Sequence, residues 1–156
     1  MIDNALILLR EELTAYLTAQ GDPAPVIIEN IGLFETEQGA DLQDNIIISL
    51  VNIEEESSFK NGQTFSKWPD GKARYENRPV YLNLYVLFTA NFPGGVPPNN
   101  GYVHALKRLS LVIEFFQGKN VFTPASSSVP LPPELSDLGN PDIASLQLKL
   151  ENVQAP

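Results

Sequence analysis

Residues 78–92, RPVYLNLYVLFTANF, form the most strand-like segment of this 156-residue chain and are followed by a Pro-Gly-Gly turn. A strand with one face in water alternates cleanly between apolar and polar residues, and this segment does not. Its apolar side chains fall on both faces, with Val80, Leu82, Leu84, Val86 and Phe88 on one and Tyr81, Tyr85 and Leu87 on the other. The pattern therefore predicts a central strand that is covered on both faces and holds no group suited to catalysis.

Two other segments have the periodicity of amphipathic helices. Residues 4–19 place most of their leucines on one face and end before Gly21 and Pro23, which favour a helix stop. Residues 102–117 end before Gly118, and their apolar stripe is wide enough to lie between layers or under a partner subunit. The members of this stripe are Leu106, Leu109, Leu111, Val112, Ile113, Phe115 and Phe116.

Further strands are expected at residues 26–34, 45–53 and 144–153, with a short edge strand at 120–122. Residues 123–133 are rich in Ser and Pro and are expected to form an extended surface arm. This order of elements predicts an α+β (mixed α/β) fold, in which one sheet of about four to five strands packs against two main helices. The length predicts a single domain over residues 1–156.

The residue types that most enzymes need are scarce in this chain. It has no cysteine, one histidine (His104) and no Gly-x-Ser-x-Gly nucleophile motif. Glu11 and Glu12 are adjacent on the first predicted helix and point in different directions, so both are expected on the solvated surface. The sequence therefore predicts a protein that is not an enzyme and has no metal or cofactor. A small hydrolase with a carboxylate site is the enzymatic alternative that the many acidic residues leave open.

Three consecutive acids, Glu54, Glu55 and Glu56, follow the strand expected at residues 45–53. Carboxylates of this kind can bind Mg²⁺ or Ca²⁺, but the spacing of a calcium loop is missing. Successive side chains on a strand also point in opposite directions, so the three groups do not converge on one ion. The triplet is expected to end the strand and to make a charged contact.

Charge is distributed unevenly along the chain. Residues 1–56 contain twelve acidic residues and one basic residue, whereas residues 57–156 contain seven acidic and nine basic residues. The net charge of −9 argues against nucleic acid as a partner, although basic and aromatic residues alternate near residues 65–75. Five of the ten basic residues lie in one short stretch, which is either a solvated loop or the basic side of a head-to-tail contact with an acidic neighbour.

Three regions are candidates for contact with a partner: the long polar connection at residues 57–78, the Ser- and Pro-rich arm at 123–133 and the last strand at 144–153. Trp68 either anchors this connection on the edge of the core or forms an interface hot spot. The last strand leaves a sheet edge that another chain could extend. The candidate partner-binding residues are Glu54, Glu55, Glu56, Lys60, Lys67, Trp68, Lys72, Arg74, Arg78, Leu146, Leu148 and Leu150.

Three stretches in this order resemble a known family: SLVNIEEE at residues 49–56, the segment at 78–92, and LSLVIEFFQ at 109–117 followed by Val121 and Phe122. They are similar to the N-terminal domain family of the tail-cap, or tail-terminator, protein of extracellular contractile injection systems, which are phage-tail-like particles. The opening helix and Asn61 also fit, and the resemblance covers most of residues 1–125.

The resemblance implies a structural role without catalysis. Members of this family form a six-fold ring at the tail end away from the baseplate, where the ring stops growth of the inner tube and docks the last sheath ring. The implied partners are other copies of the chain, the inner-tube protein and the sheath protein, and neither nucleic acid nor a membrane. Family members usually continue with another helix and a closing strand, so residues 1–156 are expected to be part of a longer subunit.

The alternative function is a non-enzymatic adaptor or binding module for another protein. The N-terminal residues lack the cationic flank of a secretory signal, and no apolar run approaches the roughly 20 residues that span a bilayer. The chain is therefore expected in the cytoplasm during assembly, and afterwards in an injection particle that can be released from the cell.

Overall fold

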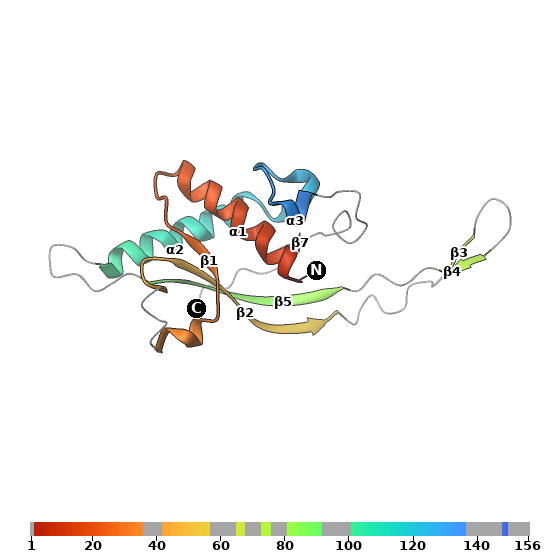
Figure 1. Cartoon of the computed structure of the whole chain (residues 1–156), viewed down its shortest axis with the longest axis horizontal. Coiled ribbons are helices and arrows are strands. Elements are labelled where there is room, and N and C mark those ends of the chain that lie inside the picture. Colours follow the sequence, from red (N-terminus) through yellow and green to blue (C-terminus); the bar gives the residue numbers. More distant parts are fainter. Residues whose placement is uncertain are drawn as a thin grey trace. The chain divides into compact units, whose positions relative to one another are not determined.

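The computed structural model describes residues 2–35, 42–56, 65–67, 73–75, 81–91, 101–136 and 148–149. The chain divides into two compact units, which are described separately: a first unit of residues 1–49 and 87–156, and a second unit of residues 50–86. The main elements are α1 (Ile2–Ala19), β1 (Val26–Ile28), β2 (Ile46–Glu55), β3 (Phe65–Lys67), β4 (Ala73–Tyr75), β5 (Leu82–Ala90), α2 (Gly101–Gly118), β6 (Val121–Phe122), α3 (Pro133–Ser136) and β7 (Leu148–Lys149) (Figure 1). Short 3-10 helices occupy Ile31–Glu35 and Pro124–Ser126.

The elements confirm the α+β class with two main helices. The described strands form a three-stranded mixed sheet in the order β1-β2-β5 and two separate two-stranded ladders, β3-β4 and β6-β7. β1 runs parallel to β2, with Val26 opposite Ile46 and Ile28 opposite Ile48. None of the described helices combines the length and the apolar character needed to cross a membrane. The single domain over residues 1–156 stays a prediction.

The central strand of the three-stranded sheet is β2, so the prediction of a central strand at residues 78–92 was wrong. Ile46, Ile47 and Ile48 are all fully buried, which requires cover on both faces of the sheet. β5 lies at the edge of the sheet formed by the described strands. β5 has apolar residues on both of its faces, and Leu82, Tyr85 and Leu87 among them are exposed.

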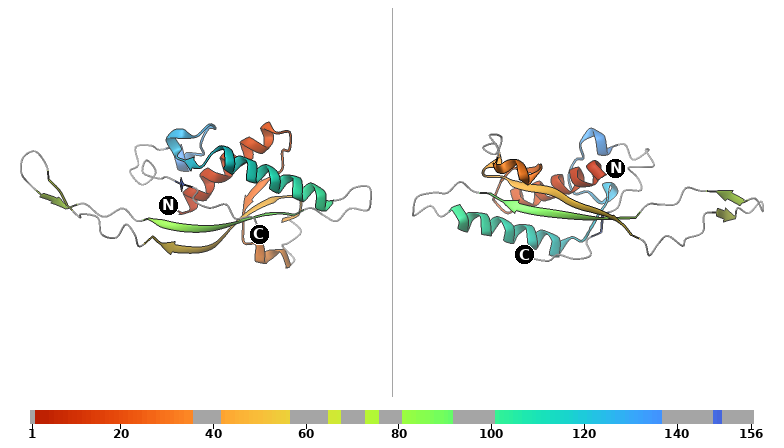
Figure 2. Two further views of the ribbon diagram at one scale, coloured as in Figure 1. Left: turned by 180° about the vertical axis from the view of Figure 1, so that it is seen from behind. Right: turned by 90° about the horizontal axis from the view of Figure 1, so that it is seen from below.

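The core of the first unit lies between α1, α2 and the sheet. Both helices lie on the same side of the sheet strands of this unit (Figures 1 and 2). Leu6, Leu9, Leu13 and Leu17 of α1 are buried, as the helical period predicts, and each fully buried leucine stabilises the fold by about 1.5–3 kcal/mol. An aromatic cluster joins the layers, with the Phe115 ring centroid 5.3 Å from Tyr16 and 5.4 Å from Phe122.

The end of α1 follows the prediction that Gly21 stops the helix. Gly21 has a φ of 82°, a left-handed conformation that glycine adopts without a steric penalty. The Asp22 N–H donates to the Leu17 carbonyl at 3.0 Å, and the Gly21 N–H donates to the Thr18 carbonyl at 3.1 Å. This pair of bonds is a Schellman motif, which satisfies the last carbonyl groups of the helix and fixes the backbone at Asp22.

The Ser- and Pro-rich segment after α2 is folded against the rest of the first unit, so the predicted extended surface arm at residues 123–133 was wrong. Thr123 caps the 3-10 helix Pro124–Ser126, because its side chain accepts a bond from the Ser126 N–H and the Ser126 hydroxyl accepts one from the Thr123 N–H. Pro124 is buried, and Leu135 of α3 is fully buried. α3 packs against α1.

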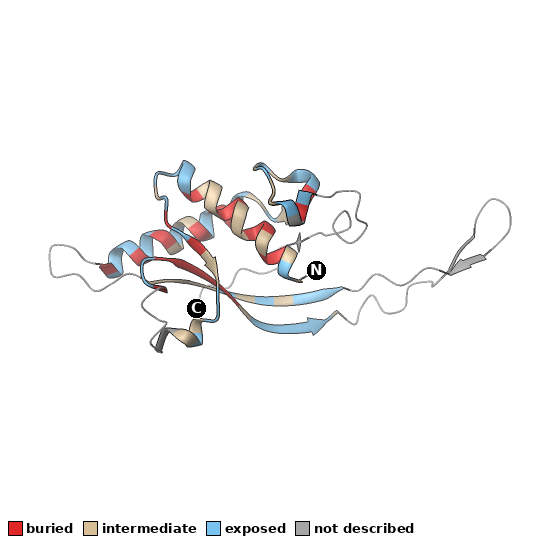
Figure 3. Cartoon of the chain, in the orientation of Figure 1, coloured by how far each residue is buried: buried red, intermediate tan, exposed pale blue. Residues whose placement is uncertain are grey.

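The second unit contains the outer half of β2, the first half of β5 and the β3-β4 ladder. The Glu56 N–H donates to the Tyr81 carbonyl at 3.0 Å, which joins the two long strands at their outer ends. β3 and β4 are antiparallel, with Ser66 opposite Arg74 and Lys67 opposite Ala73. Figure 3 shows the change along β2 from buried residues at its start to exposed residues at its end.

Candidate protein-protein interface

The structure describes the acidic members of the predicted partner-binding set but only a few of the others. Lys67 lies in β3, Arg74 in β4 and Leu148 in β7, where it pairs with Phe122. The positions outside the described residues are Lys60, Trp68, Lys72, Arg78, Leu146 and Leu150. Whether any of these residues binds a partner therefore stays a prediction.

One face of the outer β2/β5 ribbon is polar. The Tyr85 hydroxyl donates to Glu54 Oε2 at 3.1 Å, and the Asn83 amide donates to Glu56 Oε2 at 3.1 Å. The hydrogen bond to Glu54, together with the negative charge of that carboxylate, raises the pKa of Tyr85. Glu54 and Glu56 thus share one face, as the alternation of a strand requires. In the described part of the chain, no group of three His, Asp or Glu side chains is arranged to hold a metal ion.

The opposite face of the same ribbon is apolar apart from Glu55, which alternates with Ile53 and Val51 along β2. Because Glu54, Glu56, Asn83 and Tyr85 occupy the polar face, alternation places their apolar neighbours on the other one. We define the apolar ribbon face as Val51, Ile53, Leu82, Leu84 and Val86. Val51 is 66% exposed and Ile53 is 43% exposed, whereas Leu84 and Val86 are half-buried. Exposed apolar patches of this kind mark surfaces that bind other proteins.

A second exposed apolar surface lies on α2. Tyr102 is 72% exposed and Leu106 is 44% exposed, and Ile113 is also exposed. These residues are four and seven positions apart, so they lie along one side of the helix. We call Tyr102, Leu106 and Ile113 the α2 stripe. The predicted apolar stripe of this helix is thus divided: Val112, Phe115 and Phe116 are buried in the core, but Leu106 and Ile113 are not.

Arg108 explains which side of α2 faces the core. This residue is buried and only 9% exposed. Its Nε donates to Asp22 Oδ2 at 3.1 Å, and its Nη1 donates to Asp44 Oδ1 at 2.7 Å and to the Asp44 carbonyl at 3.0 Å. Burial lowers the pKa of Arg108, but the two carboxylates outweigh this effect and hold its pKa above the ordinary value. The paired arginine turns inward, so Leu106 and Ile113 turn outward.

Glu12 is buried, so the prediction of a solvated Glu11 and Glu12 pair was wrong for Glu12. It is 3% exposed. Lys119 Nζ donates to Glu12 Oε2 at 2.8 Å, and the Ser128 N–H and hydroxyl donate to its two oxygens at 2.8 and 2.9 Å. Burial raises the pKa of Glu12, but Lys119 and the serine donors outweigh it and lower the pKa below its ordinary value. Glu12 therefore fastens the segment after α2 to α1.

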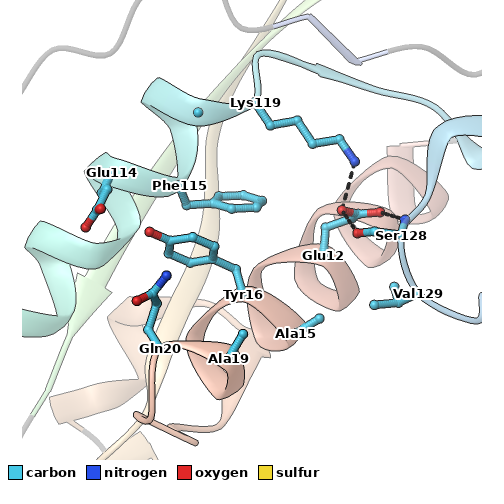
Figure 4. Close-up of a pocket in the computed structure, with 11 residues that line it drawn as sticks. Glu12, Ala15, Tyr16, Ala19, Gln20, Glu114, Phe115, Lys119, Ser128 and Val129 are labelled. Carbon is cyan, nitrogen blue, oxygen red and sulfur yellow. Dashed lines mark hydrogen bonds and ion pairs between the residues drawn. The ribbon is translucent and has the colours of Figure 1, made fainter.

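A depression of about 550 Å³ lies between α1 and α2, next to this ion pair. Figure 4 shows Lys119 reaching Glu12 on one side, with Tyr16 beside Phe115 in the middle. Burial, followed by the nearby Glu114 carboxylate, raises the pKa of Tyr16. The charged groups of Glu12 and Lys119 bind each other and stabilise the fold. The other residues that line the depression include Ala15, Ala19 and Val129.

Sequence reasoning missed both buried charges, although each had a signal. Arg108 lies three residues after the buried Ala105 and four before the buried Val112, and Glu12 lies four residues after the buried Leu8. A charged residue at a core position of the helical period indicates a paired buried group. The partner in each case is distant in sequence, so the pairing itself could not be predicted.

The comparison with protein families supports the relation to phage-tail-like particles. The model of a protein family described as the Pvc16 N-terminal domain matches residues 7–155. This range includes most of the first unit and all of the second. Among curated proteins, no match was found.

Proposed function

Because this chain belongs to the Pvc16 N-terminal domain family and is thus related to the structural proteins of contractile injection systems, we propose that it caps the tail of such a particle. In this proposal, six copies form a ring at the end of the tail that is distant from the baseplate. The ring ends the inner tube and docks the last ring of the sheath. The partners are other copies of the chain, the inner-tube protein and the sheath protein.

The family match over residues 7–155 carries this proposal. The exposed apolar residues support it, because they are gathered on the outer β2/β5 ribbon and on one side of α2. A subunit that acts by assembly needs such surfaces, and a ring subunit needs at least two of them on different parts of the molecule. We propose accordingly that the chain acts through its surfaces and not as an enzyme, in the cytoplasm during assembly and then in the particle.

The test is deletion of the gene in a strain that produces the particles, followed by electron microscopy of purified tubes. We expect tubes of uncontrolled length that lack a closed end. Complementation with a tagged copy should restore a defined length and give a six-fold density at the end opposite to the baseplate. Tubes of normal length in the deletion strain would contradict the proposal.

The same samples separate a cap from an adaptor. An adaptor that carries another protein should leave tube length unchanged when it is deleted, and its tagged form should be found with its cargo and not at a tube end. If the copy number at the end of the tube is not six, the chain still has a role in the particle. The proposed six-fold ring would then be wrong.

A further inference from the structure

Residues 123–136, which we call the strap, bury little apolar surface. Among the strap residues whose burial the structure describes, Pro124 and Leu135 are buried, whereas α1 has seven buried residues. The start of the strap is fixed, because Phe122 is buried and its ring centroid lies 5.4 Å from that of Phe115. A segment with so few buried apolar residues belongs to the parts of a protein that open locally at a low cost in free energy.

The polar contacts of the strap converge on one ion pair. The Ser128 N–H and hydroxyl donate to the two carboxylate oxygens of Glu12 at 2.8 and 2.9 Å. Lys119 Nζ donates to Glu12 at 2.8 Å and to the Ser126 carbonyl at 3.2 Å. Among the described atoms, every hydrogen bond between the strap and the rest of the first unit ends on Glu12 or Lys119. One buried carboxylate thus holds the polar side of the strap.

We propose that Glu12 is an acid-sensitive latch, whose protonation releases the strap from α1 while the rest of the first unit stays folded. A carboxylate accepts hydrogen bonds at both oxygens, but a protonated carboxyl group carries a hydrogen on one of them and has no charge to attract Lys119. The strap then retains its apolar anchors and loses its polar one. The latch operates within a single chain and does not depend on the proposed ring.

Lys119 is the charged group that binds Glu12 among the described side chains. Arg10 and Glu11 bind each other on the partly exposed surface of α1. Tyr16 and Glu114 lie together on the other side of the depression (Figure 4). Residues 123–129 contain no titratable side chain. The titratable or charged residues of the elements around Glu12, apart from Lys119, are Arg10, Glu11 and Tyr16 of α1, Glu114 of α2 and Glu134 of α3.

The direction of the switch follows from the environment of Glu12. Lys119 and the serine donors hold the pKa of Glu12 below its ordinary value of 4.5 in the folded chain, although burial acts in the opposite direction. The contribution to the closed strap is therefore complete above about pH 4.5 and is lost as the pH falls through the lower, folded pKa. Opening of the strap also removes Ser128 and Val129 from the wall of the depression.

Hydrogen exchange of the natural chain between pH 7 and pH 3 tests the latch. The amides of Ser126, Ser128 and Val129 report on the strap, and those of Leu13 and Leu17 report on α1. Protection factors are compared, because they are corrected for the direct effect of pH on exchange. We expect protection of the strap to fall by about tenfold or more below about pH 4, while protection of α1 changes less.

Substitutions identify the group that titrates. Glu12→Gln should open the strap at pH 7 and make its protection independent of pH, because glutamine has no charge and only one acceptor oxygen. Lys119→Met should shift the opening to a higher pH, because the carboxylate loses the cation that favours its charged form. Leu135→Ala is the matched control. It should loosen the strap at every pH and leave the pH dependence unchanged.

Thiol labelling gives an independent measurement at neutral pH, because the chain contains no cysteine of its own. Leu135→Cys places a thiol at a fully buried position of the strap, which a reagent reaches only after opening. Addition of Glu12→Gln should raise the labelling rate by about tenfold or more. The rate at Ala105→Cys, a buried control position in α2, should change less.

Three results would overturn the latch. The first is protection of the strap that stays constant as the pH falls. The second is loss of protection in the strap and in α1 at the same pH, which is global unfolding by acid. The third is a Lys119→Met chain whose strap opens at the same pH as that of the natural chain, because Glu12 would then not be the group that titrates. This third result can be obtained even if Glu12→Gln fails to fold.

Discussion

Arg108 is a buried cation with carboxylate partners from two different segments of the chain. Asp22 follows α1, and Asp44 precedes β2 with a φ of 62°. Asp22 and Asp44 keep part of their surface in water, with side chains 29% and 56% exposed. Solvent therefore offsets part of the cost when the arginine is removed, in contrast to a fully buried pair.

We expect Arg108→Met to lower the free energy of unfolding by about 1–3 kcal/mol, because two aspartates lose their charged hydrogen bonds. Urea unfolding at pH 7 measures this loss. Arg10→Met is the control, since Arg10 pairs with Glu11 on a partly exposed surface of α1 and should contribute about 0–1 kcal/mol. Equal losses for the two variants would contradict the role of Arg108.

The lowered pKa of Glu12 makes the free energy of unfolding decrease at low pH. Its pKa is lower in the folded chain than the ordinary value of 4.5, so the folded state favours the carboxylate. The stabilisation is therefore present above the unfolded pKa and is lost as the pH falls through the lower, folded pKa. Glu12→Gln should cost about 1–3 kcal/mol at pH 7, and the difference from the natural chain should shrink below about pH 4.

Urea unfolding of both proteins between pH 7 and pH 3 checks this prediction. Glu11→Gln is a suitable control, because Glu11 neighbours Glu12 on the same helix but is less buried. It should change the free energy of unfolding by less than about 1 kcal/mol at neutral pH. The role of Glu12 as a stabilising carboxylate would be contradicted if the free energies of unfolding of Glu12→Gln and the natural chain differed by the same amount at every pH.

At the scale of elements, α1 and the start of β2 could be predicted from the sequence and β5 could not be placed. The helical period of α1 and the run of three isoleucines in β2 are local signals of burial. The position of a strand within a sheet is not local. β5 has the more continuous apolar pattern, but part of that pattern is exposed on the surface and does not serve the core.

The packing of the segment after α2 could also not be predicted from local sequence patterns. Its Ser and Pro content is typical of an exposed arm, but Ser128 binds Glu12 and Leu135 is buried. Both anchors depend on partners that are distant in sequence. The exposed apolar surfaces were predicted only in part, because the α2 segment was placed between layers or under a partner subunit, whereas β5 was expected to be covered on both faces. The partner-binding role of the acidic triplet stays a prediction.

Leu135→Ala tests whether this segment depends on its apolar anchor. A buried leucine replaced by alanine typically costs about 2–5 kcal/mol, and here we expect the loss to appear first as local opening of residues 123–136. Hydrogen exchange of these amides should accelerate, while exchange in α1 changes less. Leu131→Ala, at a half-buried position, should have a smaller effect. Uniform acceleration over the whole chain would indicate that the segment opens only with global unfolding.

At the scale of the whole molecule, the uneven charge predicts how copies attract each other. The basic residues Lys67, Lys72 and Arg74 lie in the part of the chain with positive net charge, and the acidic residues dominate residues 1–56. If these surfaces meet between subunits, reversal of the three basic residues to glutamate should weaken ring formation, and low salt should strengthen the difference.

Native mass spectrometry over a range of salt concentrations measures this effect. Reversal of Arg10, a partly exposed basic residue of α1 outside this stretch, is the control and should not weaken assembly. If the triple variant assembles at the same protein concentration as the natural chain, the basic stretch is a solvated loop. This is the other interpretation of the sequence.

The left-handed turn at Gly21 has a consequence for how this protein can change during evolution. The turn aims Asp22 at Arg108, which is 86 residues further along the chain, and the same arginine also needs the unusual backbone of Asp44. The positions 21, 22, 44 and 108 therefore depend on one another in the folded chain. A chain that replaces the arginine should therefore tolerate changes at both aspartates, whereas Gly21 is still needed because it ends α1.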